Sequence, residues 1–240
     1  LAKYNRKAVV WDEAVDGGLL PTTTMVTGWR GVKQCLNSTA KGYPTIIMPS
    51  SVFYLDKRQA RYDRGNGTTK YVSLKTVCDF SIEKYGFTPE QTKSIAGVEG
   101  AFWSENHLPY ITPDRHYSDF LEYMFFPRIF AMAEVAWSKE RRSYDEMIEV
   151  MKDSFYHKLN AMGSAFRLED PTIKVENGEI VVTTDDGSTI YYTDVRTNKT
   201  RKYKKPLDAE LVPFVTFRSE LMTGYSNNVA APEFYISRKE

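Results

Sequence analysis

Short apolar runs alternate with longer segments of helical pattern up to about residue 165. Four runs have the length of strands: AVVWDE (8–13), TMVTGW (24–29), PTIIMPSS (44–51) and SIAGVEGAFWSE (94–105). Between the second and the third run, GVKQCLNSTAKGY (31–43) has the length of a helix. Strands that alternate with helices are typical of parallel β/α units, so this half of the chain predicts an α/β fold.

Two later segments predict helices. In FFPRIFAMAEVAWS (125–138), Pro127 suits a first helical turn. Apolar residues recur there with helical spacing, at Ile129, Met132, Ala133 and Ala136. The second segment, YDEMIEVMKDSFYHKLNAMG (144–163), runs to Gly163, a residue type that commonly ends helices. Trp137, at the end of the first segment, is expected to pack in a helix interface.

The pattern changes after residue 171. VENGEIVVTTDDGSTIYYTD (175–194) consists of short strand-like runs separated by Asn-Gly and Asp-Gly, which favour tight turns. KYKKPL, PFVTFRSELM and PEFYISRK continue this pattern without helical periodicity. We therefore predict two domains: an α/β domain at 1–165 and a small all-β domain, most simply a sandwich, at 171–240.

Composition excludes several classes of function. The 32 basic and 31 acidic residues give a formal charge of +1, which is no electrostatic footprint for nucleic acid or an anionic membrane. No apolar run approaches the roughly 20 residues of a membrane-spanning helix. The 3 histidines lack metal-ligand spacing, so we predict no metal and no other cofactor. Cys35 and Cys78 can pair or stay free, and we favour free, buried thiols.

Aromatic residues and carboxylates gather at the ends of the strand-like runs. Each strand-like run ends with or is soon followed by an aromatic residue, and in three cases a carboxylate comes two positions after that aromatic residue. The pairs are Trp11 with Glu13, Tyr54 with Asp56 and Trp103 with Glu105, and Trp29 stands without one. Residues two apart on a strand share a face, and in a parallel barrel the carboxyl ends of the strands build the active site. Stacking rings beside carboxylates suit a neutral, hydroxyl-rich ligand such as a sugar.

A purely structural interpretation of the same residues stays open. A tryptophan after an apolar run commonly belongs to the core, and a carboxylate near a strand end commonly caps a helix. Asp12 and Glu13 look like an acid–base pair, but neighbours on a strand face opposite sides. The residues by themselves therefore leave both sugar binding and core packing open.

Five motifs in series carry a family resemblance. They are WDEA, VTGWRG, PSSVFYLD, GVEGAFWSE and FPRIFAMAEVAWS, and in this order they resemble glycoside hydrolase family 20, the β-N-acetylhexosaminidases, over roughly residues 5–165. The resemblance implies a TIM (β/α)₈ barrel, of which this chain holds the C-terminal half, about four β/α units, followed by a small all-β sandwich domain. It also implies removal of terminal nonreducing N-acetylglucosamine or N-acetylgalactosamine. In that retaining reaction the substrate's own acetamido oxygen attacks the anomeric carbon.

The resemblance assigns roles to six residues. Tyr54 matches the tyrosine whose hydroxyl holds the acetamido oxygen for attack. Trp11, Trp29 and Trp103 match the tryptophans that enclose the acetamido methyl and the sugar ring. Asp56 and Glu105 match the carboxylates that bind sugar hydroxyls on the nonreducing side.

One family motif has no match in this chain. It is an adjacent Asp-Glu pair after an earlier strand, in which Asp orients the acetamido nitrogen and Glu is the general acid; WDEA matches the next motif along. We therefore expect the isolated chain to be inactive without the missing N-terminal half of the same protein. Its sheet either stays open or pairs with a second copy, and we favour self-association.

Two functions and one location follow as expectations. The first function is that of a β-N-acetylhexosaminidase acting on N-acetylhexosamine-containing glycans, and the alternative is a noncatalytic carbohydrate-binding or interaction module. The family resemblance implies a periplasmic, cell-surface or secreted bacterial protein, with any signal upstream of this chain. The motifs leave gluco- and galacto-substrates both open.

Overall fold

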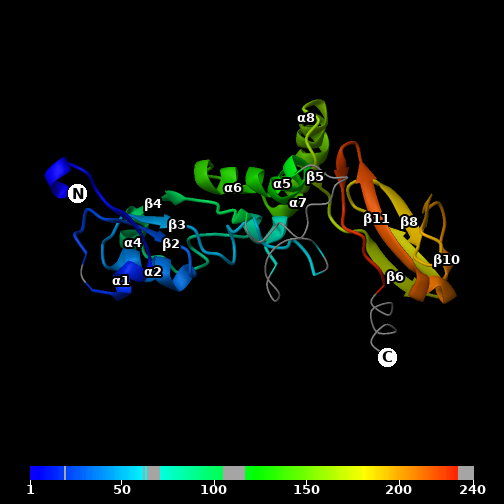
Figure 1. Ribbon diagram of the computed structural model, residues 1–240, viewed down its shortest axis with the longest axis horizontal. Coiled ribbons are helices and arrows are strands. Elements are labelled where there is room, and N and C mark those ends of the chain that lie inside the picture. The colour runs from blue at the N-terminus through cyan, green and yellow to red at the C-terminus, as the bar shows by residue number, and fades with distance from the viewer. Residues whose placement is uncertain (19, 62, 64–70, 105–116, 232–240) are drawn as a thin grey trace. The chain divides into compact units, whose positions relative to one another are not determined.

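The computed structural model describes all residues except 19, 62, 64–70, 105–116 and 232–240 (Figure 1). The described residues form two compact units. One comprises residues 1–61, 71–104 and 128–147, and the other comprises residue 63 with residues 117–127 and 148–231. The domain boundary expected near residue 165 stays a prediction.

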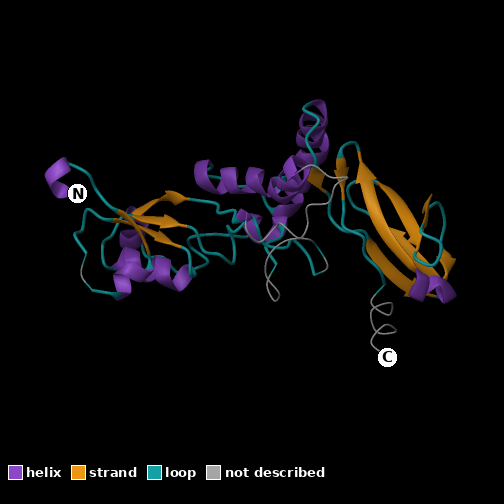
Figure 2. Cartoon of the chain, in the orientation of Figure 1, coloured by secondary structure: helices purple, strands orange, loops and turns teal. Residues whose placement is uncertain are grey.

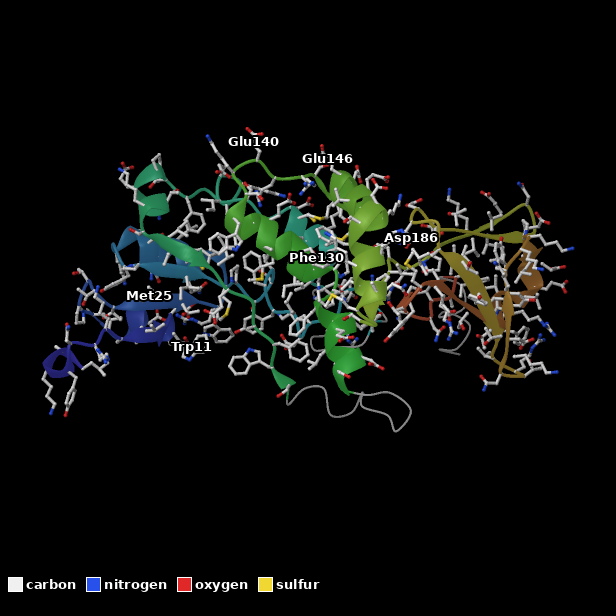
Figure 3. The ribbon with its side chains drawn as sticks, turned by 90° about the horizontal axis from the view of Figure 1, so that it is seen from above. Trp11, Met25, Phe130, Glu140, Glu146 and Asp186 are labelled. Carbon is white, nitrogen blue, oxygen red and sulfur yellow. The ribbon has the colours of Figure 1, made fainter. Side chains whose placement is uncertain are left out.

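The first unit contains a parallel four-stranded sheet (Figure 2). Its strands, in the order in which they pair, are β1 (Val9–Trp11), β2 (Met25–Gly28), β3 (Thr45–Ile47) and β4 (Ile95–Val98). The four strand-like runs and their parallel pairing are thus confirmed. Met25 and Trp11, both labelled in Figure 3, mark the amino and carboxyl ends of the β1–β2 pair.

Helix α2 (Val32–Ala40) packs against this sheet, as the sequence predicts (Figure 1). It contacts both β2 and β3, in which Val26 and Ile47 are fully buried. Gly28 allows the close approach, because a Cβ at this position would lie 2.4 Å from the Sγ of Cys35. Both cysteines are unpaired, which confirms the preference for free thiols; Cys35 is fully buried, whereas Cys78 is only half-buried.

In the described part of this unit, the opposite face of the sheet is exposed at β1 and buried at Thr27 of β2. Val10 pairs in register with the buried Val26, so Val9 and Trp11 point to the other face. Their side chains are 63% and 46% exposed. Three short helices accompany the sheet in this unit: α1 (Glu13–Asp16), α3 (Leu74–Cys78) and α4 (Pro89–Lys93).

Helix α6 (Arg128–Trp137) forms where predicted but turns a different face inward. Arg128 and Ala131 are its buried residues, whereas Ile129 is 38% and Trp137 89% exposed. The expectation that Trp137 packs in a helix interface is therefore wrong. Helical periodicity counts apolar residues, and it cannot register an arginine that occupies the inward side.

The predicted helical segment at 144–163 is also confirmed. It consists of α7 (Tyr144–Val150), a π-helical turn (Met151–Phe155) and α8 (Tyr156–Ala161). Gly163 follows with a φ of 70°, the left-handed conformation of a helix end. The second unit adds α5 (Tyr117–Phe125). None of the helices in the described part of the chain is long and apolar enough to cross a membrane.

The second unit contains two sheets (Figure 2). The three-stranded sheet has the order β10 (Leu207–Asp208), β7 (Glu179–Thr183), β6 (Thr172–Glu176). The five-stranded sheet has the order β5 (Phe166–Arg167), β12 (Gly224–Tyr225), β11 (Val215–Leu221), β8 (Thr189–Asp194), β9 (Lys199–Lys202). Strands of both sheets contribute to one apolar core, which includes Ile180 of β7 and Phe217 of β11.

The two turn sequences of this unit have different outcomes. Asn177 and Gly178, at φ of 53° and 76°, close the β6–β7 hairpin as predicted. The Asp-Gly sequence at 186–187 instead connects β7 to β8, which belong to different sheets. The segment PEFYISRK (232–239) lies outside the described residues.

A buried ionic cluster lies beside β5. Arg167 is 2% exposed, and its guanidinium contacts the carboxylates of Asp63, with Nε–Oδ2 at 2.6 Å, and Asp170, with Nη2–Oδ1 at 3.0 Å. The Tyr123 hydroxyl donates to the other oxygen of Asp63 at 2.9 Å. Arg167 Nη1 also lies 3.6 Å from Oε2 of the partly exposed Glu169. Three carboxylates thus share one guanidinium, which leaves an excess of negative charge.

This excess predicts a pH dependence of stability. Burial raises the pKa of Asp170 from 3.8 to about 6; Arg167 opposes the rise and Asp63 adds to it. Since the folded pKa is the higher one, the stability from this group is fully present below about pH 4 and is lost as pH rises through about 6. We expect urea unfolding of the second unit to show a loss of about 2 kcal/mol over this window. Asp170→Asn is expected to remove this loss of stability, and the control Asp185→Asn, at an exposed position, is expected to retain it. If the unfolding free energy of Asp170→Asn depended on pH as that of the wild type does, Asp170 would not be the group responsible.

Candidate active site

Four aromatic side chains come together at the carboxyl ends of the strands. Trp11 ends β1, Trp29 follows β2, Tyr54 lies beyond β3 and Trp103 lies beyond β4. The ring centroids of Trp11 and Trp103 are 6.3 Å apart with an angle of 45° between the planes. Those of Trp29 and Tyr54 are 6.1 Å apart at 21°. A side-chain hydrogen bond from Trp103 to Tyr54 joins the two pairs.

Backbone pairing beyond the strand ends fixes the segment that carries Tyr54. Tyr54 forms a parallel bridge with Ala101, so the β3–β4 pairing resumes after an interruption. The Leu55 amide donates to the Ala101 carbonyl at 2.8 Å, and the Ala101 amide donates to the Phe53 carbonyl at 3.0 Å. Tyr54 is thereby held in extended backbone at the same end of the sheet as the tryptophans.

The Tyr54 hydroxyl is a permanent hydrogen-bond donor. Burial raises the pKa of Tyr54 above its ordinary value of 10.0; the Trp103 hydrogen bond opposes this, and the nearby charge of Asp56 adds to it. The residue is 7% exposed. Because the hydroxyl stays protonated at all physiological pH values, it can donate to an oxygen of a bound ligand without titrating.

Glu13 orients the indole of Trp29. The Trp29 Nε1–H donates to both carboxylate oxygens of Glu13, at 3.0 and 2.9 Å. Desolvation acts to raise the pKa of Glu13, but the Trp29 hydrogen bond and others outweigh it and the pKa is lowered. The carboxylate therefore remains ionised, and it holds one side of the Trp29–Tyr54 stack.

Asp12 and Glu13 do not face opposite sides of a strand, which corrects the expectation from alternation. β1 ends at Trp11 and helix α1 begins at Glu13, so the two residues lie at a helix start. Asp12 is buried and accepts hydrogen bonds from Arg30, from Nε at 2.6 Å and from the amide at 3.2 Å. Burial raises the pKa of Asp12, and Arg30 opposes the rise.

The pairs that suggested the site lie beyond the regular strands. β4 ends at Val98, before Trp103, and Glu105 lies outside the described residues, so the Trp103–Glu105 pair stays a prediction. Tyr54 and Asp56 follow β3 in a bridge and a turn, and Asp56 is fully buried. The roles assigned to these residues stay predictions.

Arg30 is the residue that sequence reasoning missed. It forms ion pairs with Asp12 at 2.6 Å and with Asp16 at 2.6 Å, and so fixes the start of α1, from which Glu13 reaches Trp29. A signal was present, since Arg30 directly follows Trp29 in VTGWRG. Among the residues that the structure describes, no group of three or more His, Cys, Asp or Glu could hold a metal ion; His107 and His116 lie outside them.

Comparison with models of known protein families identifies the family of this chain. The model of the glycosyl hydrolase family 20 catalytic domain matches residues 1–140. The chain belongs to glycosyl hydrolase family 20. This confirms the resemblance carried by the five motifs, and the match includes every residue discussed at the strand ends.

The relatives within family 20 are longer proteins. A β-hexosaminidase of Porphyromonas gingivalis is 25% identical over an aligned length of 146, and the match covers 58% of this chain and 17% of that protein. The N,N'-diacetylchitobiase of Vibrio harveyi is 23% identical over an aligned length of 209, and the match covers 69% of this chain and 23% of that protein. The chain thus spans about a fifth of the length of these relatives.

Solved family 20 structures share the fold. The exo-β-N-acetylglucosaminidase of Vibrio harveyi, solved with N-acetylglucosamine, matches with a TM-score of 0.58 and 24% identity, covering 70% of this chain and 25% of that one. A Streptomyces plicatus β-hexosaminidase mutant, solved with N-acetylglucosamine as product, matches with a TM-score of 0.57 and 22% identity, covering 69% and 33%. These similarities support the α/β fold.

Proposed function

We propose that this chain is part of a β-N-acetylhexosaminidase. The enzyme would remove terminal nonreducing N-acetylglucosamine or N-acetylgalactosamine from glycans. The observation that carries the proposal is the joined set of Trp11, Trp29, Tyr54 and Trp103 at one end of a parallel sheet. Membership of family 20 and the activities named for its relatives support it.

In the proposed reaction, Tyr54 holds the nucleophile that the substrate supplies. Its hydroxyl donates to the acetamido oxygen and keeps that oxygen against the anomeric carbon. The oxygen–carbon bond forms while the bond to the leaving glycosidic oxygen breaks, and water later opens the cyclic intermediate with retained configuration. The buried, protonated state of Tyr54 suits a donor whose hydrogen bond strengthens as charge develops.

The tryptophans and the carboxylates hold the sugar in this scheme. Trp11 and Trp103 are 46% and 39% exposed, so their rings offer apolar surface to the pyranose and the acetamido methyl. Trp29 backs Tyr54 by stacking on it. Asp56 and Glu105 accept hydrogen bonds from sugar hydroxyls on the nonreducing side, which favours release of terminal residues. No cofactor enters the scheme.

Further strands of the same protein complete the barrel in this proposal. β1 and β4 stand at the two ends of the sheet order, and Val9 and Trp11 of β1 are exposed. Eight strands close a TIM barrel, and the longer relatives have the length to supply the others. Those strands would bring the Asp-Glu pair that this chain does not match. The second unit would then be an appended sandwich, and the enzyme a periplasmic, cell-surface or secreted bacterial protein.

Hydrolysis tests the proposal against a noncatalytic module. The complete gene product that contains this chain is incubated with nitrophenyl N-acetyl-β-glucosaminide, and proton NMR follows the anomer released first. We expect steady turnover and the β-anomer as first product, because two displacements restore the configuration. Binding of N-acetylglucosamine without turnover would favour the carbohydrate-binding module, and the α-anomer as first product would exclude substrate assistance.

A further inference from the structure

Arg128, the first residue of α6, is buried with three main-chain carbonyls as hydrogen-bond acceptors. The side chain is fully buried, and it is the largest of the fully buried side chains in the described structure. Its Nη2 donates to the Leu55 carbonyl at 2.6 Å. Its Nη1 donates to the carbonyls of Val72 at 2.7 Å and Lys57 at 3.2 Å. A buried guanidinium needs such acceptors, because an isolated buried charge is strongly unfavourable.

The acceptors of Arg128 enclose the segment that carries two proposed site residues. Leu55 and Lys57 flank Asp56, and Tyr54 directly precedes Leu55. The Lys57 amide donates back to the Tyr54 carbonyl at 3.2 Å, so residues 54–57 form a tight turn. The guanidinium therefore binds this turn by hydrogen bonds to the carbonyls of the residues on both sides of Asp56.

The third acceptor, the Val72 carbonyl, belongs to a segment that lies next to this turn. The Val72 amide donates to the Arg58 carbonyl at 2.9 Å. This hydrogen bond holds Val72 next to the end of the turn at residues 54–57. Arg128 binds the carbonyls of Lys57 and Val72, one on each side of this hydrogen bond. One planar side chain thus ties α6, the turn and the Val72 segment together.

We propose that Arg128 is a positioning residue that sets where Tyr54 and Asp56 stand relative to the bound sugar. The proposal rests on the function proposed above for those two residues. Arg128 acts only through their backbone and is not a catalytic residue itself. The planar fork of a guanidinium fixes several acceptors in one geometry, which an ammonium group does not reproduce.

Two variants of Arg128 in the complete gene product separate positioning from folding. Arg128→Lys keeps the charge and loses the fork, and Arg128→Met loses both. Thermal unfolding and far-UV circular dichroism establish that each variant is folded at the assay temperature. We expect kcat on nitrophenyl N-acetyl-β-glucosaminide to fall about 10-fold or more for Arg128→Lys and about 10²-fold for Arg128→Met, because a displacement of about 1 Å at reacting groups has effects of that size.

Arg141 offers a matched control. Its Nη1 also donates to a main-chain carbonyl, that of Phe80, outside the turn at residues 54–57. Arg141→Lys makes the same chemical change at a carbonyl that no site residue adjoins. We expect it to leave kcat and KM unchanged. A folded Arg128→Lys enzyme with normal kcat would overturn the proposal.

A spectroscopic readout keeps the proposal testable apart from activity. Near-UV circular dichroism reports the stacked pair of Trp29 and Tyr54, and Trp29→Phe identifies its contribution. We expect Arg128→Lys to change this signal and Arg141→Lys to leave it. If the wild-type protein has no hexosaminidase activity, the proposed function fails, while the changed signal still supports positioning and an unchanged one overturns it. Failure of both Arg128 variants to fold would also overturn it, since Arg128 would then serve the core as a whole.

Discussion

Tyr54→Phe in the complete gene product is expected to lower kcat and kcat/KM together by about 10² or more. The change removes one hydroxyl and leaves the ring that stacks on Trp29. The lost hydrogen bond strengthens as the acetamido oxygen attacks, so the transition state loses more than the bound substrate does. Steady-state kinetics on nitrophenyl N-acetyl-β-glucosaminide measure the effect, and KM is expected to change little.

Tyr43 supplies the control for this substitution. It is also a buried tyrosine of the first unit, and its hydroxyl accepts from the Leu20 amide at 3.1 Å. It precedes β3, whereas Tyr54 follows that strand, so it lies toward the other end of the sheet. Tyr43→Phe should affect stability and leave kcat unchanged. Near-normal kcat in Tyr54→Phe would remove Tyr54 from the mechanism.

The 240-residue chain by itself is expected to show no measurable turnover on the same substrate. No residue of this chain matches the family's general acid, and protonation of the leaving group contributes about 10²–10⁴ in rate. Tyr54 and the tryptophans are retained, so the loss would come from the absent acid. Turnover near that of the complete gene product would contradict this prediction.

Light scattering on the same sample tests the state of the sheet edges. In the described part of the chain β1 and β4 are the edge strands of this sheet, so each has an outer side that the β1–β4 pairing does not use, and Val9 and Trp11 expose apolar surface. Pairing of two copies would cover these groups. We expect the mass of a dimer or a larger assembly, and a monodisperse monomer would show that the open sheet persists.

The local pattern predicted most of the elements in the described structure. The four strands of the first sheet, α2 and the helical segment up to Gly163 follow from apolar runs, lengths and end signals. The Asn177–Gly178 turn followed from its two residues, because both adopt positive φ. These features depend on residues close together in the sequence, so they can be predicted from the local pattern.

The features that the sequence did not predict depend on distant partners. Arg167 reaches Asp63, 104 residues away, and the inward position of Arg128 depends on carbonyls of Leu55 and Val72. No periodicity encodes a buried arginine, because its burial depends on acceptors that tertiary structure supplies. Trp137 was mispredicted for the same reason, since α6 turns Arg128 inward.

Within the candidate site, the gathering of aromatic residues was predicted but its supports were not. Trp11, Trp29, Tyr54 and Trp103 come together because parallel strands end at one edge of the sheet. The strand alternation predicted for Trp11 with Glu13 failed, because β1 ends at Trp11 and α1 begins at Glu13. Glu13 therefore contacts Trp29, which follows the next strand, β2, instead of sharing a strand face with Trp11.

The ratio of kcat/KM for two substrates tests the central claim most directly. The complete gene product is assayed with nitrophenyl N-acetyl-β-glucosaminide and with nitrophenyl β-glucoside, which has a hydroxyl in place of the acetamido group. The glucoside offers no oxygen for attack and leaves the Tyr54 donor without its acceptor, so the account predicts a ratio of at least about 10³ in favour of the acetamido substrate. A ratio near one would contradict a site built around the acetamido group.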